Sequence, residues 1–198
     1  MEIKLNLSKE LIDHIDQLKQ EWFLTTQEEV IETAKFLRAK GAIFYFLHCQ
    51  SSYPAALNDA VESFKCLLRM GYESQNIFIG GDSAGGNLSI VTILKLQEAS
   101  KPLPSKVFLL SPWADLTGEG RSIKENSLSD PYLSYDDWLN TSKSMKKNVE
   151  QWYAPNQDYT NPLISPVFAN FKNFPQTLIQ VSNIEILYSD SITISDNL

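Results

Sequence analysis

The five residues 81–85, Gly-Asp-Ser-Ala-Gly, constrain the fold of this chain more than any other stretch. They form a G-x-S-x-G pattern that follows apolar and small residues at 77–80 and precedes a helix-like pattern. This spacing is typical of a serine on a tight turn between a strand and a helix. Because the turn strains the serine backbone, we expect that Gly81 and Gly85 are needed where side chains would not fit.

A serine on such a turn is suited to nucleophilic chemistry. The turn would lift Ser83 Oγ clear of the sheet and leave the Ala84 N–H free at the helix N-terminus, where it could stabilise a developing oxyanion. Ser83 is therefore the candidate nucleophile, with Asp82 and Gly86 completing the turn. The alternative interpretation is a glycine-rich turn whose serine is unreactive.

Composition limits the class of protein. The chain has 198 residues, 43% of them hydrophobic and 21% charged, which is ordinary for one globular domain. Its formal net charge of −7 would repel a phosphate backbone, so we expect no nucleic-acid partner. Residues 1–10 do not resemble a secretory signal, and the longest apolar run, 42–47, is too short to span a membrane. Two cysteines without metal-ligand spacing favour a cytoplasmic location, and we expect no metal or cofactor.

Helix-like and strand-like patterns alternate along the chain. Apolar spacing and capping residues predict helices at 8–22, from Thr26 to just before Gly41, from Pro54 to Gly71, over Ala84–Glu98, and from Ser134 to Trp152. Short apolar runs predict strands at 42–47, 76–80, Lys106–Leu110 and 177–181. Residues 111–131 and 161–175 are expected to be irregular.

This alternation predicts an α/β fold with a mostly parallel sheet and helices on both faces. In such sheets, ligands bind beyond the carboxyl ends of the strands. Ser83, Ser111 and Ser182 each follow a predicted strand and would lie on that rim.

Several stretches together resemble one known family. They are 53–60 (Tyr-Pro-Ala-Ala-Leu-Asn-Asp-Ala), 80–88 around Ser83, 110–116 (Leu-Ser-Pro-Trp-Ala-Asp-Leu), 130–131 (Asp-Pro), 161–166 (Asn-Pro-Leu-Ile-Ser-Pro) and 175–181 (Pro-Gln-Thr-Leu-Ile-Gln-Val). With these stretches the chain resembles the hormone-sensitive lipase-like branch of the α/β-hydrolase fold, a group of carboxylesterases and lipases. The resemblance implies one incomplete domain over 1–198, with an N-terminal helix in 1–25 and a cap-side insertion of loops and a helix at 112–176.

The resemblance also implies a catalytic triad of serine, acid and histidine in that chain order. Ser83 matches the nucleophile. The acid of the family follows the strand predicted at 177–181, and Glu185 occupies that position, with Asp190 as the nearby alternative. A solvated loop carboxylate is the other interpretation of Glu185. By the same comparison, Asp82 and Asp115 are structural.

Two parts of the family pattern have no counterpart in this sequence. The family carries a His-Gly-Gly-Gly-type loop before the nucleophile, and no such loop is present. Its catalytic histidine follows the acid, whereas the two histidines of this chain, His14 and His48, precede Ser83. No catalytic histidine is therefore identified, and we expect a chain that lacks the first strands and the last strand and helix of the family.

The function implied by the resemblance is that of a serine carboxylic-ester hydrolase acting on a small apolar ester, weak or inactive in this chain because a general base is absent. One alternative is a non-catalytic protein of the same fold that binds a small ligand, as a plant hormone receptor of this family does. Another is a degenerate gene product. An exposed sheet edge would favour pairing with a second copy of the chain.

Overall fold

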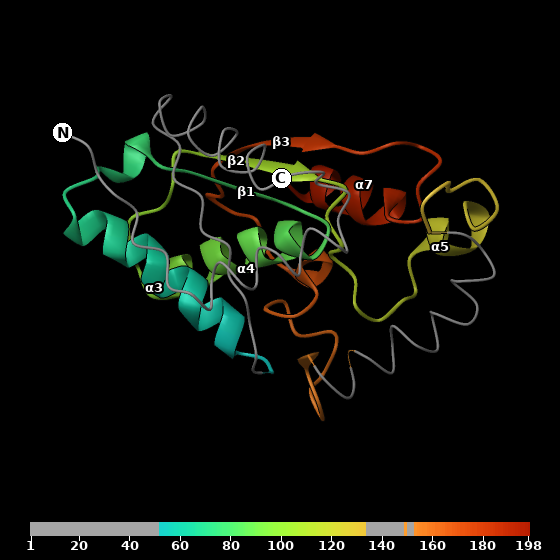
Figure 1. The fold of residues 1–198 in the computed structure, drawn as a ribbon, viewed down its shortest axis with the longest axis horizontal. Coiled ribbons are helices and arrows are strands. Elements are labelled where there is room, and N and C mark those ends of the chain that lie inside the picture. Colours follow the sequence, from blue (N-terminus) through green and yellow to red (C-terminus); the bar gives the residue numbers. More distant parts are fainter. Residues whose placement is uncertain (1–51, 134–148, 150–152) are drawn as a thin grey trace, which may run out of the picture. The chain divides into compact units, whose positions relative to one another are not determined.

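The computed structural model describes residues 52–133, 149 and 153–198, and the fold is given for these residues. Three strands alternate with helices along the chain (Figure 1). The elements are α3 (Ala55–Arg69), η1 (Ser74–Asn76), β1 (Phe78–Asp82), α4 (Ala84–Glu98), β2 (Lys106–Leu110), α5 (Arg121–Glu125), η3 (Pro166–Phe168), β3 (Gln176–Gln180) and α7 (Tyr188–Asn197).

The three strands form one parallel sheet in the order β1-β2-β3. Their registers coincide, so that Asp82, Leu110 and Gln180 are partners at the carboxyl ends. The predicted parallel sheet is therefore confirmed, and the residues that follow the three strands share one rim.

Helix α3 follows directly from its apolar spacing. Leu57, Val61, Phe64 and Leu67 recur every three or four residues and are all buried. The helix is followed by Gly71, whose φ of +90° is readily adopted only by glycine. α3 packs against α4, which lies along the sheet in Figure 1.

One face of the sheet carries the main core. Val107 and Leu109 of β2 pack with Ile90 and Ile93 of α4 and with Ile194 of α7. The other face, reached by the alternate residues of each strand, is exposed: Phe78 is 60% exposed, Phe108 43% and Leu178 66%. Within the described residues, helices therefore cover the face of the sheet that carries Val107 and Leu109, as predicted, and the face that carries Phe108 is exposed.

The element boundaries show where local pattern was sufficient. α4 and β2 have the predicted bounds, whereas β1 begins and ends two residues later and β3 one residue earlier than predicted. Two helices were not predicted: α5, within an expected loop, and α7, whose buried positions include Asp190 and Ser191 instead of apolar residues. The helices predicted at 8–22, 26–40 and 134–152 and the strand at 42–47 lie outside the described residues, apart from Val149, as does the proposed N-terminal helix. No helix within the described ranges is long and apolar enough to cross a membrane.

Candidate active site

Ser83 lies between β1 and α4 in a backbone conformation that residues with side chains rarely adopt. Its φ is 52° and its ψ is −117°. Such a conformation costs about 1–3 kcal/mol and persists only when surrounding contacts hold it. Here the Ser83 N–H donates to the Leu110 carbonyl at 2.9 Å, and the Ser83 carbonyl accepts from the Trp113 N–H at 3.0 Å. The last residue of β2 and the loop that follows it thus hold the serine backbone on both sides.

The glycines of the turn have different reasons to be glycine. A Cβ at Gly81 would overlap the carbonyl of Gly85, and a Cβ at Gly86 would approach Pro112 Cβ to 2.8 Å. At Gly85 a Cβ would meet nothing within 4 Å. The expectation that side chains would not fit at both flanking glycines is therefore right for Gly81 and wrong for Gly85, and Gly86 is the second crowded position.

The N-terminus of α4 directs free donors at this turn. Ala84 is exposed and occupies the first position of α4, where a backbone N–H has no partner within the helix. One turn further on, buried Asn87 fixes the surroundings. Its Nδ2 donates to the carbonyls of Trp113 and Ile164, each at 2.9 Å. No sequence motif singles out Asn87, although an amide within a mostly buried helix is a signal of such a role.

Glu185 lies in the loop between β3 and α7, on the same rim as Ser83. Its Oε1 accepts from the Ser182 N–H at 2.8 Å. Partial burial and then the nearby charge of Glu185 raise the pKa of Asp82, the residue before the serine. The structure therefore brings the Glu185 carboxylate close to the turn that carries Ser83.

Asp190 has a different environment. It is 2% exposed, and its Oδ2 accepts from the N–H groups of Ala114 and Asp115, both at 2.8 Å. Burial raises its pKa to about 7. Asp115 in turn accepts from the Thr117 N–H and hydroxyl. Both carboxylates hold backbone segments in place.

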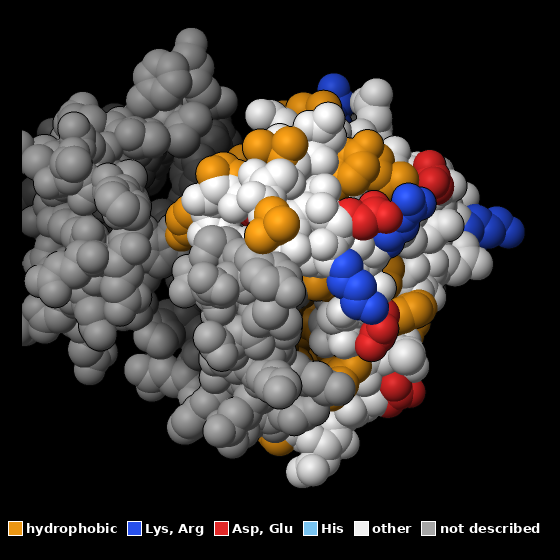
Figure 2. All heavy atoms as spheres, turned by 90° about the vertical axis from the view of Figure 1, so that its right-hand side faces the viewer, with side chains coloured by type: hydrophobic (Ala, Val, Ile, Leu, Met, Phe, Trp, Pro, Cys, Tyr) orange, Lys and Arg blue, Asp and Glu red, His pale blue; other side chains and the backbone are white. Residues whose placement is uncertain are grey.

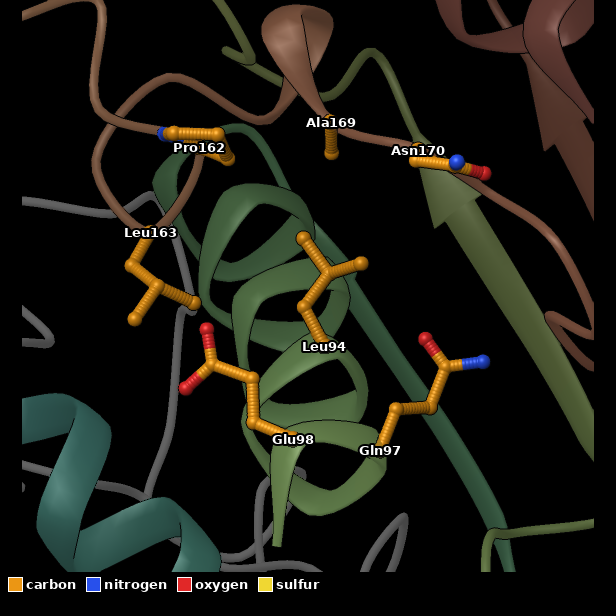
Figure 3. A pocket seen from close by; sticks show the side chains of 7 residues that line it. All are labelled: Leu94, Gln97, Glu98, Pro162, Leu163, Ala169 and Asn170. Carbon is orange, nitrogen blue, oxygen red and sulfur yellow. The ribbon is translucent and has the colours of Figure 1, made fainter. Parts of the chain in front are cut away.

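The described residues hold no group of three or more His, Cys, Asp or Glu side chains arranged for a metal ion. A pocket of about 200 Å³ lies elsewhere, between α4 and residues 162–170 (Figure 3). Leu94, Gln97 and Glu98 line it from the second half of α4. Since Leu94 follows Ser83 by eleven residues, about 16 Å along a helix, this pocket is not part of the candidate site.

A parallel sheet with connecting helices and a serine at a strained strand-to-helix turn define the class of α/β hydrolases. Residues 41–198 match the model of a family described as having the alpha/beta hydrolase fold. The chain belongs to this family, in its hormone-sensitive lipase-like branch.

The similar proteins are esterases and related hydrolases. An acetyl-hydrolase of Streptomyces hygroscopicus is 33% identical over 157 residues, in an alignment that covers 77% of this chain and 50% of that protein. An esterase of Acinetobacter venetianus is 31% identical over 147 residues, 74% of this chain and 46% of its own length. A crystal structure of a hormone-sensitive lipase from a metagenome library aligns with a TM-score of 0.67 and 35% identity, covering 77% of this chain and 49% of that one. The chain thus spans about half the length of the relatives it matches.

Proposed function

We propose that this protein is a serine carboxylic-ester hydrolase in which Ser83 is the nucleophile and Glu185 is the acid of the triad. The observation that carries the proposal is the backbone of Ser83, held at a φ of 52° between β1 and the N-terminus of α4. In this position the Ala84 N–H would donate to the oxyanion of the tetrahedral intermediate. Glu185 would orient a histidine and stabilise its protonated form.

The same proposal assigns little or no activity to residues 1–198 alone. Their two histidines, His14 and His48, precede Ser83 and lie outside the described residues. Without a general base a serine hydroxyl is a poor nucleophile at neutral pH, and in a comparable enzyme removing the histidine costs on the order of 10⁶ in turnover. A small apolar ester as substrate, a cytoplasmic location and pairing of two copies through the sheet edge remain predictions.

Site-resolved labelling tests the assignment of Ser83. The chain is incubated with a fluorophosphonate, and the modified residue is located by mass spectrometry. We expect slow modification at Ser83 that exceeds that of Ser111, a second strand-end serine with a positive φ of 42°. Ser83→Ala should remove this adduct and Ser111→Ala should not. Equal modification of both serines would contradict the nucleophile assignment. Turnover of a p-nitrophenyl ester at 1 s⁻¹ or faster, the usual range for enzymes, would contradict the assignment of low activity.

A further inference from the structure

The loop that carries Glu185 is held by one segment far away in the sequence. We call residues 182–187 the acid loop. The carbonyl groups of four consecutive acid-loop residues, 183–186, each accept a hydrogen bond from a side chain of residues 122–129. No other stretch of the described chain binds so many consecutive backbone groups through its side chains.

Asn126 makes two of these bonds. Its Nδ2 donates to the carbonyl of Asn183 at 2.9 Å and to that of Glu185 at 2.7 Å. Ser129 Oγ donates to the carbonyl of Ile184, between them, at 3.1 Å, and Ser122 Oγ donates to that of Ile186. Together they fix the acid-loop backbone on either side of the Glu185 Cα.

Asp130 also binds the acid loop, in this case as a hydrogen-bond acceptor. Its Oδ2 accepts from the Ile186 N–H at 2.9 Å, and its Oδ1 accepts from the N–H groups of Tyr132 and Leu133. The Asp130 side chain is buried, and these three N–H groups supply the hydrogen bonds that a buried carboxyl group requires. The side of the molecule where α5 lies exposes hydrophobic side chains among charged ones (Figure 2). Ile123, Ile186 and Leu187 form a buried hydrophobic cluster in the same region, so apolar packing and these backbone bonds together hold it.

We propose that Asn126 is a positioning residue for Glu185, acting through the acid-loop backbone together with Ser122, Ser129 and Asp130. Glu185 Oε1 is bound to the Ser182 N–H of the same loop, so fixing the loop backbone fixes the carboxylate. Glu185 Oε2 is then left to accept from a histidine. This inference rests on the proposed role of Glu185 for its catalytic meaning, whereas the positioning itself can be measured without catalysis.

Asp82 reports where the Glu185 carboxylate is, because the charge of Glu185 contributes to its raised pKa. The test is a pH titration of the Asp82 carboxyl by carbon-detected NMR in the full chain. Glu185→Gln should lower the titration midpoint of Asp82. Asn126→Ala should lower it in the same direction, because the released loop carries Glu185 away. The Ser182 N–H should also exchange with solvent about tenfold faster.

Gln97→Ala is the matched control. Gln97 also donates an amide hydrogen bond to a distant backbone carbonyl, that of Lys172 at 3.1 Å, away from the acid loop. It should leave both readouts unchanged. If Asn126→Ala does not fold, Ser129→Ala removes one exposed bond of the same set and should shift both readouts in the same direction by less. A folded Asn126→Ala chain with the wild-type Asp82 midpoint would overturn the proposal.

The labelling experiment separates this inference from the proposed function. Because Glu185 would act on Ser83 only through a histidine and residues 1–198 contain no histidine after Glu185, Glu185→Gln and Asn126→Ala should both leave the slow labelling of Ser83 unchanged. If both variants shift the Asp82 midpoint but Ser83 and Ser111 are labelled equally, positioning by Asn126 stands and the proposed function is wrong.

Discussion

At the scale of single residues, the carboxyl group of Asp190 has a strongly raised pKa. One carboxylate oxygen holds the loop after β2, which binds the Ser83 carbonyl through Trp113. The other, Oδ1, is buried and finds no hydrogen-bond partner among the described residues. Desolvation therefore outweighs the two backbone donors and raises the pKa of Asp190 to about 7. The carboxyl group of Asp190 is therefore harder to ionise than that of an exposed aspartate.

Asp190→Asn should change how stability depends on pH. A carboxyl with a raised pKa in the folded state contributes stability below pH 4, and this contribution is lost as the pH rises to about 7. A shift from 3.8 to about 7 corresponds to a loss of at most about 4 kcal/mol. The variant keeps the acceptor for Ala114 and Asp115 but cannot ionise, so its stability relative to wild type should improve between pH 4 and 8. Urea unfolding at several pH values measures this, and a constant difference would contradict it.

At the scale of elements, the turn from β1 to α4 depends on close backbone contact. Gly81 lies against the Gly85 carbonyl, and Gly86 lies against Pro112. Asn87 adds hydrogen bonds to two further segments. Since strand, turn and helix are held at these few points, the conformation of Ser83 is a property of the whole strand–turn–helix unit.

Gly81→Ala and Gly85→Ala should therefore differ in their effect on stability. The first places a methyl group into the Gly85 carbonyl and should destabilise the protein by about 1–3 kcal/mol, as overpacking does. The second adds a methyl group in open space within α4 and should be neutral or stabilising by up to about 1 kcal/mol. Free energies of unfolding from urea titrations compare the two. Equal destabilisation would show that the contact at Gly81 is not what the turn requires.

At the scale of the whole described fold, the two faces of the sheet differ sharply. Along β3 the exposed and partly buried residues alternate, with Leu178 on the outer face and Ile179 packed against the core. Gly80 lies beside Phe108 on the outer face, and a Cβ there would overlap the aromatic ring. The Phe108 ring therefore lies across Gly80, where any side chain would collide with it.

Neighbouring lysine substitutions on β3 should report this difference. Leu178→Lys, at a side chain 66% exposed, should change the free energy of unfolding by no more than about 0.5 kcal/mol. Ile179→Lys would place a charge against the core and should cost about 3 kcal/mol or more. Thermal unfolding of both variants, with light scattering to follow association, is the measurement. A large loss in Leu178→Lys would mean that the outer face is covered in solution.

Local patterns were enough to predict part of this fold and of its candidate site. The apolar run at Lys106–Leu110 and the helical spacing over Ala84–Glu98 gave correct boundaries, and the G-x-S-x-G pattern located the turn at Ser83. α7 was missed because two of its three buried positions, Asp190 and Ser191, are polar. The bonds from Asn126 to the acid loop join residues 57 and 59 positions apart, and such side-chain-to-backbone contacts leave no periodic signal in a sequence.

The hydrogen bond from Asn87 to Ile164 also has a consequence for biosynthesis. It joins residues 77 positions apart, so the surroundings of Ser83 remain incomplete until the ribosome has passed Ile164. At about 5–20 residues per second, this delay is roughly 4–15 seconds after Asn87 is made. During that interval the Asn87 amide lacks its Ile164 partner, whereas Leu110 and Trp113, which bind the Ser83 backbone, have already been made. The strained turn at Ser83 can therefore form before its surroundings are complete.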